Sequence, residues 1–144
     1  RDQDLITAGT RLKPDMVTDS AARAALGGAE QIAWLTVRTL SRSIVPALPG
    51  VVFLSGGQSE ESASLNLNAM NKLENIAKPW ALTFSYGRAL QQSVLKAWRG
   101  DAANVAAAQA ALLERAQANG NAAQGKYTGG SGDTASTYVA NYTY

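Results

Sequence analysis

The sequence predicts an α/β fold built on a parallel sheet. Three short apolar or β-favouring segments have the length of strands, and their separation of roughly thirty residues suits a strand–helix–strand crossover. A longer stretch with helical periodicity follows each of them. The three expected strands are Leu12 to Val17, Val51 to Leu54 and Ala81 to Ser85.

The first two expected helices have recognisable ends. One spans Ala29 to about Ile44 and is stopped by Pro46. The next begins after Ser59, whose side chain is of the type that caps a helix and is followed by two acidic residues that favour a first turn. Its predicted apolar stripe consists of Leu65, Ala69, Met70, Leu73 and Ile76.

Two further helices follow without a strand between them. The third is expected from about Arg88 to Gly100, and the fourth from a cap at Asp101 through about Gln117. From Asn121 the chain is rich in Gly, Ser, Thr and Ala, a composition that buries little apolar surface. We therefore divide the chain into a folded part, residues 1–120, and a flexible C-terminal tail, residues 121–144.

Composition excludes several classes of function. The 144 residues include no cysteine and no histidine, which removes disulfides, thiolate nucleophiles and most transition-metal sites. The net charge of +2 comes from scattered residues, so we expect a small anionic ligand rather than nucleic acid. No run approaches the ~20 apolar residues of a membrane span, and we expect a soluble protein. Because the chain starts at Arg1 without a leader pattern, we expect a cut or processed end.

Lys13 is the first candidate for chemistry. It lies in the first expected strand between apolar neighbours and is followed by Pro14. In parallel α/β enzymes the catalytic residues lie at the C-terminal ends of the strands. A lysine amine whose pKa is lowered can attack a carbonyl group. Taken alone, Lys13 is better interpreted as an ordinary surface lysine, because lysines are common near strand ends.

Two glycine turns are candidates for binding phosphate. Ser55, Gly56 and Gly57 follow the second strand and precede a capped helix, where backbone amides and the helix end attract anions. Gly87 and Arg88 hold the same place after the third strand, and a guanidinium there can clamp a phosphate. Each turn alone is compatible with a plain strand–helix connection. Two in succession match the phosphate sites of eight-stranded barrels.

In combination these motifs resemble the class I fructose-bisphosphate aldolases. The resemblance extends, in order, over Leu12 to Pro14, Phe53 to Glu61, Leu65 to Asn71, Lys78 to Leu90, Gln124 to Tyr127 and the terminal Tyr144. It implies that residues 1–120 form the sixth to eighth βα units, the C-terminal portion of a TIM (β/α)8 barrel that is incomplete over this length. It further implies a homotetrameric enzyme without a metal or other cofactor, located in the cytosol or alternatively a plastid.

The same resemblance implies the roles of individual residues. Lys13 forms a Schiff base with fructose 1,6-bisphosphate, which is cleaved reversibly to dihydroxyacetone phosphate and glyceraldehyde 3-phosphate. The substrate phosphates are held by Ser55, Gly56, Gly87 and Arg88. Tyr144, at the end of the tail, assists proton exchange at the enamine carbon.

Three departures from the family pattern qualify these expectations. The upstream strands that supply the other catalytic carboxylates and a second lysine are missing, so we expect the isolated chain to be inactive. Arg11 replaces an apolar residue, and alternation predicts that it lies on the interior face with Lys13. Asp15 replaces an asparagine, and a carboxylate near Lys13 would raise the pKa of its amine.

Two other functions remain open. A partial barrel that lacks catalytic partners can serve as a binding or interaction module. Residues Leu54 to Gln58 also match the signature of ABC-transporter ATPases, but the phosphate-binding loop which that class requires is absent.

Overall fold

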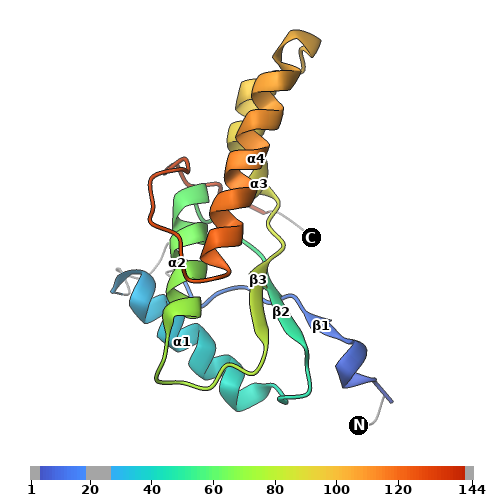
Figure 1. Cartoon of the computed structure of the whole chain (residues 1–144), viewed down its shortest axis with the longest axis vertical. Helices are drawn as coiled ribbons and strands as arrows, with labels where there is room; N and C mark the ends of the chain where they lie inside the picture. The colour runs from blue at the N-terminus through green and yellow to red at the C-terminus, as the bar shows by residue number, and fades with distance from the viewer. Residues whose placement is uncertain (1–3, 19–26, 142–144) are drawn as a thin grey trace.

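The computed structural model describes residues 4–18 and 27–141 and contains a three-stranded parallel sheet. The strands are β1 (Arg11–Leu12), β2 (Gly50–Phe53) and β3 (Ala81–Phe84), in the order β1-β2-β3. In the registers of the two strand pairs, Leu12 lies opposite Val51, which in turn lies opposite Leu82. The predicted parallel α/β fold is therefore confirmed (Figure 1).

Helices α1 (Gly28–Ser43) and α2 (Glu60–Lys72) pack against each other and lie beside the sheet (Figure 1). The core joins Val37 of α1, Phe53 of β2 and Leu67 of α2, all of which are fully buried. The predicted cap of α2 is confirmed, because the Ser59 hydroxyl accepts a hydrogen bond from the Ser62 amide at 3.0 Å. The predicted stripe is wrong at Leu65, which is exposed because the buried positions Ala63, Leu67 and Met70 define another helix face.

Helices α3 (Arg88–Trp98) and α4 (Val105–Ala122) form a hairpin that projects beyond the sheet (Figure 1). A short 3₁₀ helix, η2 (Ala102–Asn104), joins them, and a second one, η1 (Thr7–Gly9), precedes β1. The prediction that α4 ends near Gln117 is wrong. Asn119 is buried inside the helix and accepts a hydrogen bond from the Ser64 hydroxyl of α2 at 2.8 Å, a tertiary contact that makes Asn119 part of the interior.

The first strand is shorter than predicted. It ends at Leu12, so Lys13 lies just beyond it. The next backbone contact is with the residue that follows β2, where the Leu54 amide donates a hydrogen bond to the Pro14 carbonyl at 3.0 Å. Pro14 has no amide hydrogen to donate to the sheet, which limits the regular pairing. Arg11 is exposed, as is Lys13, on this sheet of three described strands, and its stem lies beside Gly50.

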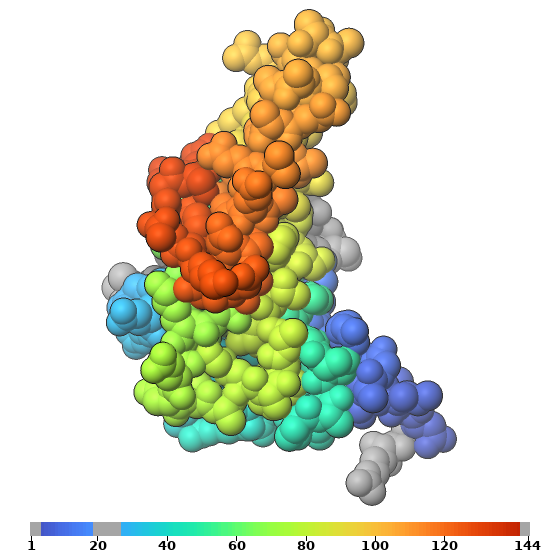
Figure 2. Space-filling model, in the orientation of Figure 1, coloured from blue at the N-terminus to red at the C-terminus, as the bar shows by residue number. Residues whose placement is uncertain are grey.

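The chain after α4, residues 123–141, is called the C-terminal segment below. It lies across α2 and the end of α4, where Figure 2 shows it against the body of the molecule while the hairpin projects away. Because α4 continues to Ala122, the segment begins later than the predicted tail boundary at residue 120. No helix within the described residues is long and apolar enough to cross a membrane.

Candidate active site

A cavity of about 600 Å³ lies at the C-terminal ends of the strands and at the start of α3. Its walls include four of the residues singled out from the sequence, namely Lys13, Ser55, Gly87 and Arg88. They meet because parallel strands end at the same edge of a sheet, so residues that follow different strands converge there. Ser85, Gln91, Gln92, Leu95 and Lys96 are also among the lining residues.

The charges around this cavity favour an anionic ligand. Three cationic side chains line it, those of Lys13, Arg88 and Lys96. Lys96 is paired with the Asp133 carboxylate of the C-terminal segment. No carboxylate is among the described residues that line the cavity, so the charged side chains of its lining are all cationic.

Lys13 is exposed where the chain leaves β1, with its side chain at the cavity wall. Asp15, predicted to face Lys13, is placed differently. Its carboxylate accepts a hydrogen bond from the Met16 amide at 2.8 Å and lies against Gly56, and no ion pair joins these two described residues, Lys13 and Asp15. Partial burial raises the pKa of the Asp15 carboxyl, and the Met16 amide opposes that shift.

The turn after β2 is closed by its own backbone. The Gln58 amide donates to the Ser55 carbonyl at 2.8 Å, and Ser55 is buried. Gly56 has a φ of +51° and lines a neighbouring groove of about 830 Å³ with Gly57 and Tyr138. The structure therefore brings Ser55 to the Lys13 cavity and places Gly56 at the adjacent groove.

Arg88 begins α3 directly after Gly87. The Gly87 carbonyl accepts the amides of Leu90 and Gln91 at 3.0 and 3.1 Å, which fixes the start of the helix. The Arg88 guanidinium is half-buried and donates to the carbonyl of Thr137, in the C-terminal segment, at 2.7 Å. Tyr144, the other predicted catalytic residue, lies outside the described residues.

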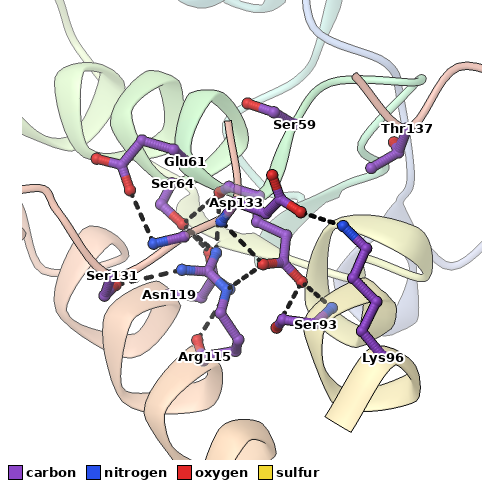
Figure 3. Close-up of polar contacts among 12 residues, drawn as sticks. Ser59, Glu61, Ser64, Ser93, Lys96, Arg115, Asn119, Ser131, Asp133 and Thr137 are labelled. Carbon is purple, nitrogen blue, oxygen red and sulfur yellow. Dashed lines mark hydrogen bonds and ion pairs between the residues drawn. The ribbon is translucent and has the colours of Figure 1, made fainter. Parts of the chain in front are cut away.

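Sequence reasoning missed a buried polar network beside the cavity (Figure 3). Glu60 is completely buried, and its carboxylate accepts the amide and hydroxyl of Ser93 at 2.9 Å each. Arg115, almost as buried, lies with its Nε 3.8 Å from that carboxylate and donates to the Glu60 carbonyl at 2.8 Å. The one sequence signal was an arginine within the alanine-rich α4. No described cluster of acidic side chains is placed to hold a metal ion.

The fold and the cavity together define a class of protein. Parallel βα units place a lysine, a serine hydroxyl and an arginine at the C-terminal ends of the strands, which is where such folds bind their ligands. This is the arrangement of a parallel α/β protein with a cationic cavity at the C-terminal edge of its sheet.

The particular family follows from comparison. The sequence model that describes the family 'fructose-bisphosphate aldolase class-I' matches residues 1–144. The chain therefore belongs to that family. It is 56% identical over 147 residues to cytosolic fructose-bisphosphate aldolase 5 of Arabidopsis thaliana, and 56% identical over 146 residues to aldolase C of Rattus norvegicus. Both comparisons cover 99% of this chain and 40% of the relative, so the chain spans about two fifths of these curated relatives.

A solved structure shows the same fold. It is fructose-bisphosphate aldolase from Plasmodium falciparum, in complex with TRAP and a small-molecule inhibitor. The match has a TM-score of 0.79 and 59% identity, and it covers 83% of this chain and 34% of that chain. The three βα units are thus part of an aldolase barrel, as the resemblance implied.

Proposed function

We propose that this chain supplies the Schiff-base lysine and part of the phosphate-binding surface of a class I fructose-bisphosphate aldolase. The observation that carries the proposal is the cavity in which Lys13 lies with Ser55, Gly87 and Arg88. An amine and two kinds of phosphate-binding group in one cationic cavity suit a phosphorylated carbonyl compound. Membership of the fructose-bisphosphate aldolase family supports fructose 1,6-bisphosphate as that compound.

In this proposal the Lys13 amine adds to carbonyl carbon C2 of the open-chain sugar, and loss of water gives an iminium ion. The iminium accepts the electron pair of the C3–C4 bond as that bond breaks, while the C4 hydroxyl gives its proton to a base. Glyceraldehyde 3-phosphate leaves and an enamine remains. Protonation at C3 and hydrolysis then release dihydroxyacetone phosphate and restore the Lys13 amine.

The remaining predicted residues bind or assist. The Ser55 hydroxyl and the backbone at Gly56 and Gly87 hold phosphate oxygens, and the Arg88 guanidinium adds a charged donor. Tyr144 exchanges the proton at the enamine carbon, as the family resemblance implies. The acid and base for the other proton transfers come from the rest of the barrel.

The other properties of the whole enzyme are part of the same proposal. Assembly as a homotetramer is inferred from the family resemblance alone. A location in the cytosol is supported by relatives whose names place them there, such as the Arabidopsis protein and a cytoplasmic isozyme of Spinacia oleracea.

Trapping of the Schiff base tests the proposal directly. The full-length protein is incubated with dihydroxyacetone phosphate, reduced with borohydride and mapped by peptide mass. In the unmodified protein we expect the label on Lys13. In a Lys13→Arg variant we expect no label and a fall in kcat of at least about a hundredfold, since the nucleophile is removed.

The exposed Lys72 of α2 provides the matched control, because a Lys72→Arg variant retains the charge far from the cavity lining. Labelling that persists in Lys13→Arg, or an unlabelled Lys13 in the unmodified protein, overturns the assignment. Sugar-phosphate binding without any borohydride-dependent label would instead favour the alternative of a binding module.

A further inference from the structure

The first turn of α2 holds the C-terminal segment by its backbone. The Glu61 carboxylate accepts hydrogen bonds from the Tyr127 hydroxyl at 2.6 Å, the Gly130 amide at 2.9 Å and the Gly132 amide at 3.1 Å. The Glu61 amide in turn donates to the Asp133 carbonyl at 3.2 Å. We call this set of contacts, between Glu61 and residues 127–133, the tail anchor.

The tail anchor is tied to the interior of the molecule. The neighbouring Glu60 carboxylate accepts the Asp133 amide at 3.1 Å in addition to the two donors of Ser93 on α3. Arg115 of α4 approaches the same carboxylate and donates to Ser131 at 3.2 Å (Figure 3). Three helices therefore fix the position at which the C-terminal segment leaves the anchor.

Gly132 gives independent evidence that this close approach is specific. A β-carbon at Gly132 would lie 2.7 Å from the Glu61 amide nitrogen and 2.9 Å from Nη1 of Arg115. Real β-carbons do not come so close to backbone atoms, so only glycine lets the segment reach the start of α2. In this part of the C-terminal segment, a glycine therefore allows close contact with α2.

Four residues after the anchor, the segment reaches the proposed phosphate site. The Thr137 amide donates to the Gly57 carbonyl at 3.1 Å, and its hydroxyl donates to the Gln58 carbonyl at 2.7 Å. The Thr137 carbonyl accepts the Nη1 hydrogen of Arg88 at 2.7 Å. The segment thus connects the turn after β2 with the guanidinium of Arg88, the first residue of α3.

We propose that Glu61 is a positioning residue for Arg88. By fixing residues 130–133, it holds the Thr137 carbonyl where that carbonyl orients the Arg88 guanidinium at the cavity that contains Lys13. A guanidinium has five donors, so it can keep a neutral acceptor while it binds a phosphate, and a side chain that is already oriented loses less rotamer freedom on binding. This inference rests on the proposed function of Arg88 and assigns its orientation to a residue that does not touch the substrate.

Two variants of the full-length protein test the proposal. Glu61→Gln removes the charge that accepts three hydrogen bonds, and Tyr127→Phe removes the hydroxyl but keeps the buried ring. We expect amide exchange of residues 130–138 to accelerate by at least about tenfold in both, as for a segment that opens locally. The KM for fructose 1,6-bisphosphate should rise by roughly three- to tenfold with a smaller change in kcat, because orientation of Arg88 is lost.

Glu114→Gln is the matched control, since Glu114 is an exposed α4 carboxylate with no polar contact to the other described residues. Faster exchange without a change in KM, a lowered KM, or the same changes in Glu114→Gln would overturn the proposal. Borohydride labelling of Lys13 in the unmodified protein separates this outcome from failure of the proposed function. If Lys13 is unlabelled, the proposed function fails, while the exchange experiment still decides whether Glu61 holds the segment.

Discussion

A side chain at Gly56 would be strained by the backbone and would displace the Asp15 carboxylate. Its φ of +51° is a left-handed conformation, and a β-carbon there would lie 2.5 Å from both carboxylate oxygens of Asp15. For Gly56→Ala we expect a loss of about 1 to 2 kcal/mol from the backbone and a further loss of about 0.5 to 1.5 kcal/mol, because the Asp15 carboxylate must move and gives up its hydrogen bond from the Met16 amide. Urea unfolding of the full-length protein measures both.

Gly100→Ala supplies the control for the backbone cost, because Gly100 has a φ of +74° but no atom lies within 4 Å of the position that a β-carbon would take. It should lose only the backbone contribution. Adding Asp15→Ala to Gly56→Ala should cost little further stability, because the hydrogen bond from the Met16 amide is already lost. Equal destabilisation by the two single glycine substitutions would show that Asp15 does not crowd Gly56.

Residues of the candidate site differed in how far the sequence could predict them. The convergence of Lys13, Ser55, Gly87 and Arg88 could be predicted because residues at the ends of parallel strands lie at one edge of the sheet, and the structure places them around one cavity. Glu60 could not be found in this way. A carboxylate in the first turn of a helix is ordinarily solvated, and its partner Arg115 lies 55 residues further along the chain.

At the scale of elements, local signals predicted helix ends and tertiary contacts altered them. α1 begins within a residue of the prediction, and Ser59 caps α2 as expected, because caps and prolines act on neighbouring residues. α4 continues beyond Gln117 because Asn119 faces the core instead of ending the helix. The C-terminal segment packs few apolar side chains, among them the buried ring of Tyr127, and carboxylates of α2 also accept its amides.

The contact between α2 and the C-terminal segment should depend on pH. Burial opposes the charge of Glu61, but hydrogen bonds from Tyr127, Gly130 and Gly132, together with the charge of Arg115, outweigh it and lower the pKa of Glu61. The hydrogen bond from Lys96 likewise lowers the pKa of Asp133. A carboxyl whose pKa is lower in the folded state stabilises that state above its unfolded pKa and loses this effect as pH falls.

We therefore expect the segment to remain held above about pH 4.5, the ordinary value for a glutamate, and to be released as pH falls through the lower folded pKa values. Amide exchange of residues 130–133 between pH 3 and 6, corrected for intrinsic rates, measures the release. Glu61→Gln should remove most of the pH dependence, and Asp133→Asn should remove the part due to the Lys96 pair. Protection that is constant over this range would contradict the assignment.

At the scale of the whole molecule, the sheet formed by the described residues has two unpaired edges. Within the described residues β1 and β3 each pair on one side only, with β2. Unpaired edges invite pairing with other chains, and a barrel of eight strands ordinarily takes about 250 residues. The core between α1, α2 and the sheet is closed, whereas the face that would line a barrel is not enclosed by these three strands.

We therefore expect the 144-residue chain alone to show no measurable cleavage of fructose 1,6-bisphosphate and to self-associate in size-exclusion chromatography. Lys13 is present, but the acid and base for the carbinolamine and cleavage steps are not among the described residues that line its cavity, where the charged side chains are cationic. An iminium without a base to take the C4 hydroxyl proton does not release glyceraldehyde 3-phosphate at an enzymatic rate. The full-length protein at equal Lys13 concentration is the reference, and turnover by the isolated chain at a comparable rate would show that these three βα units carry a complete site.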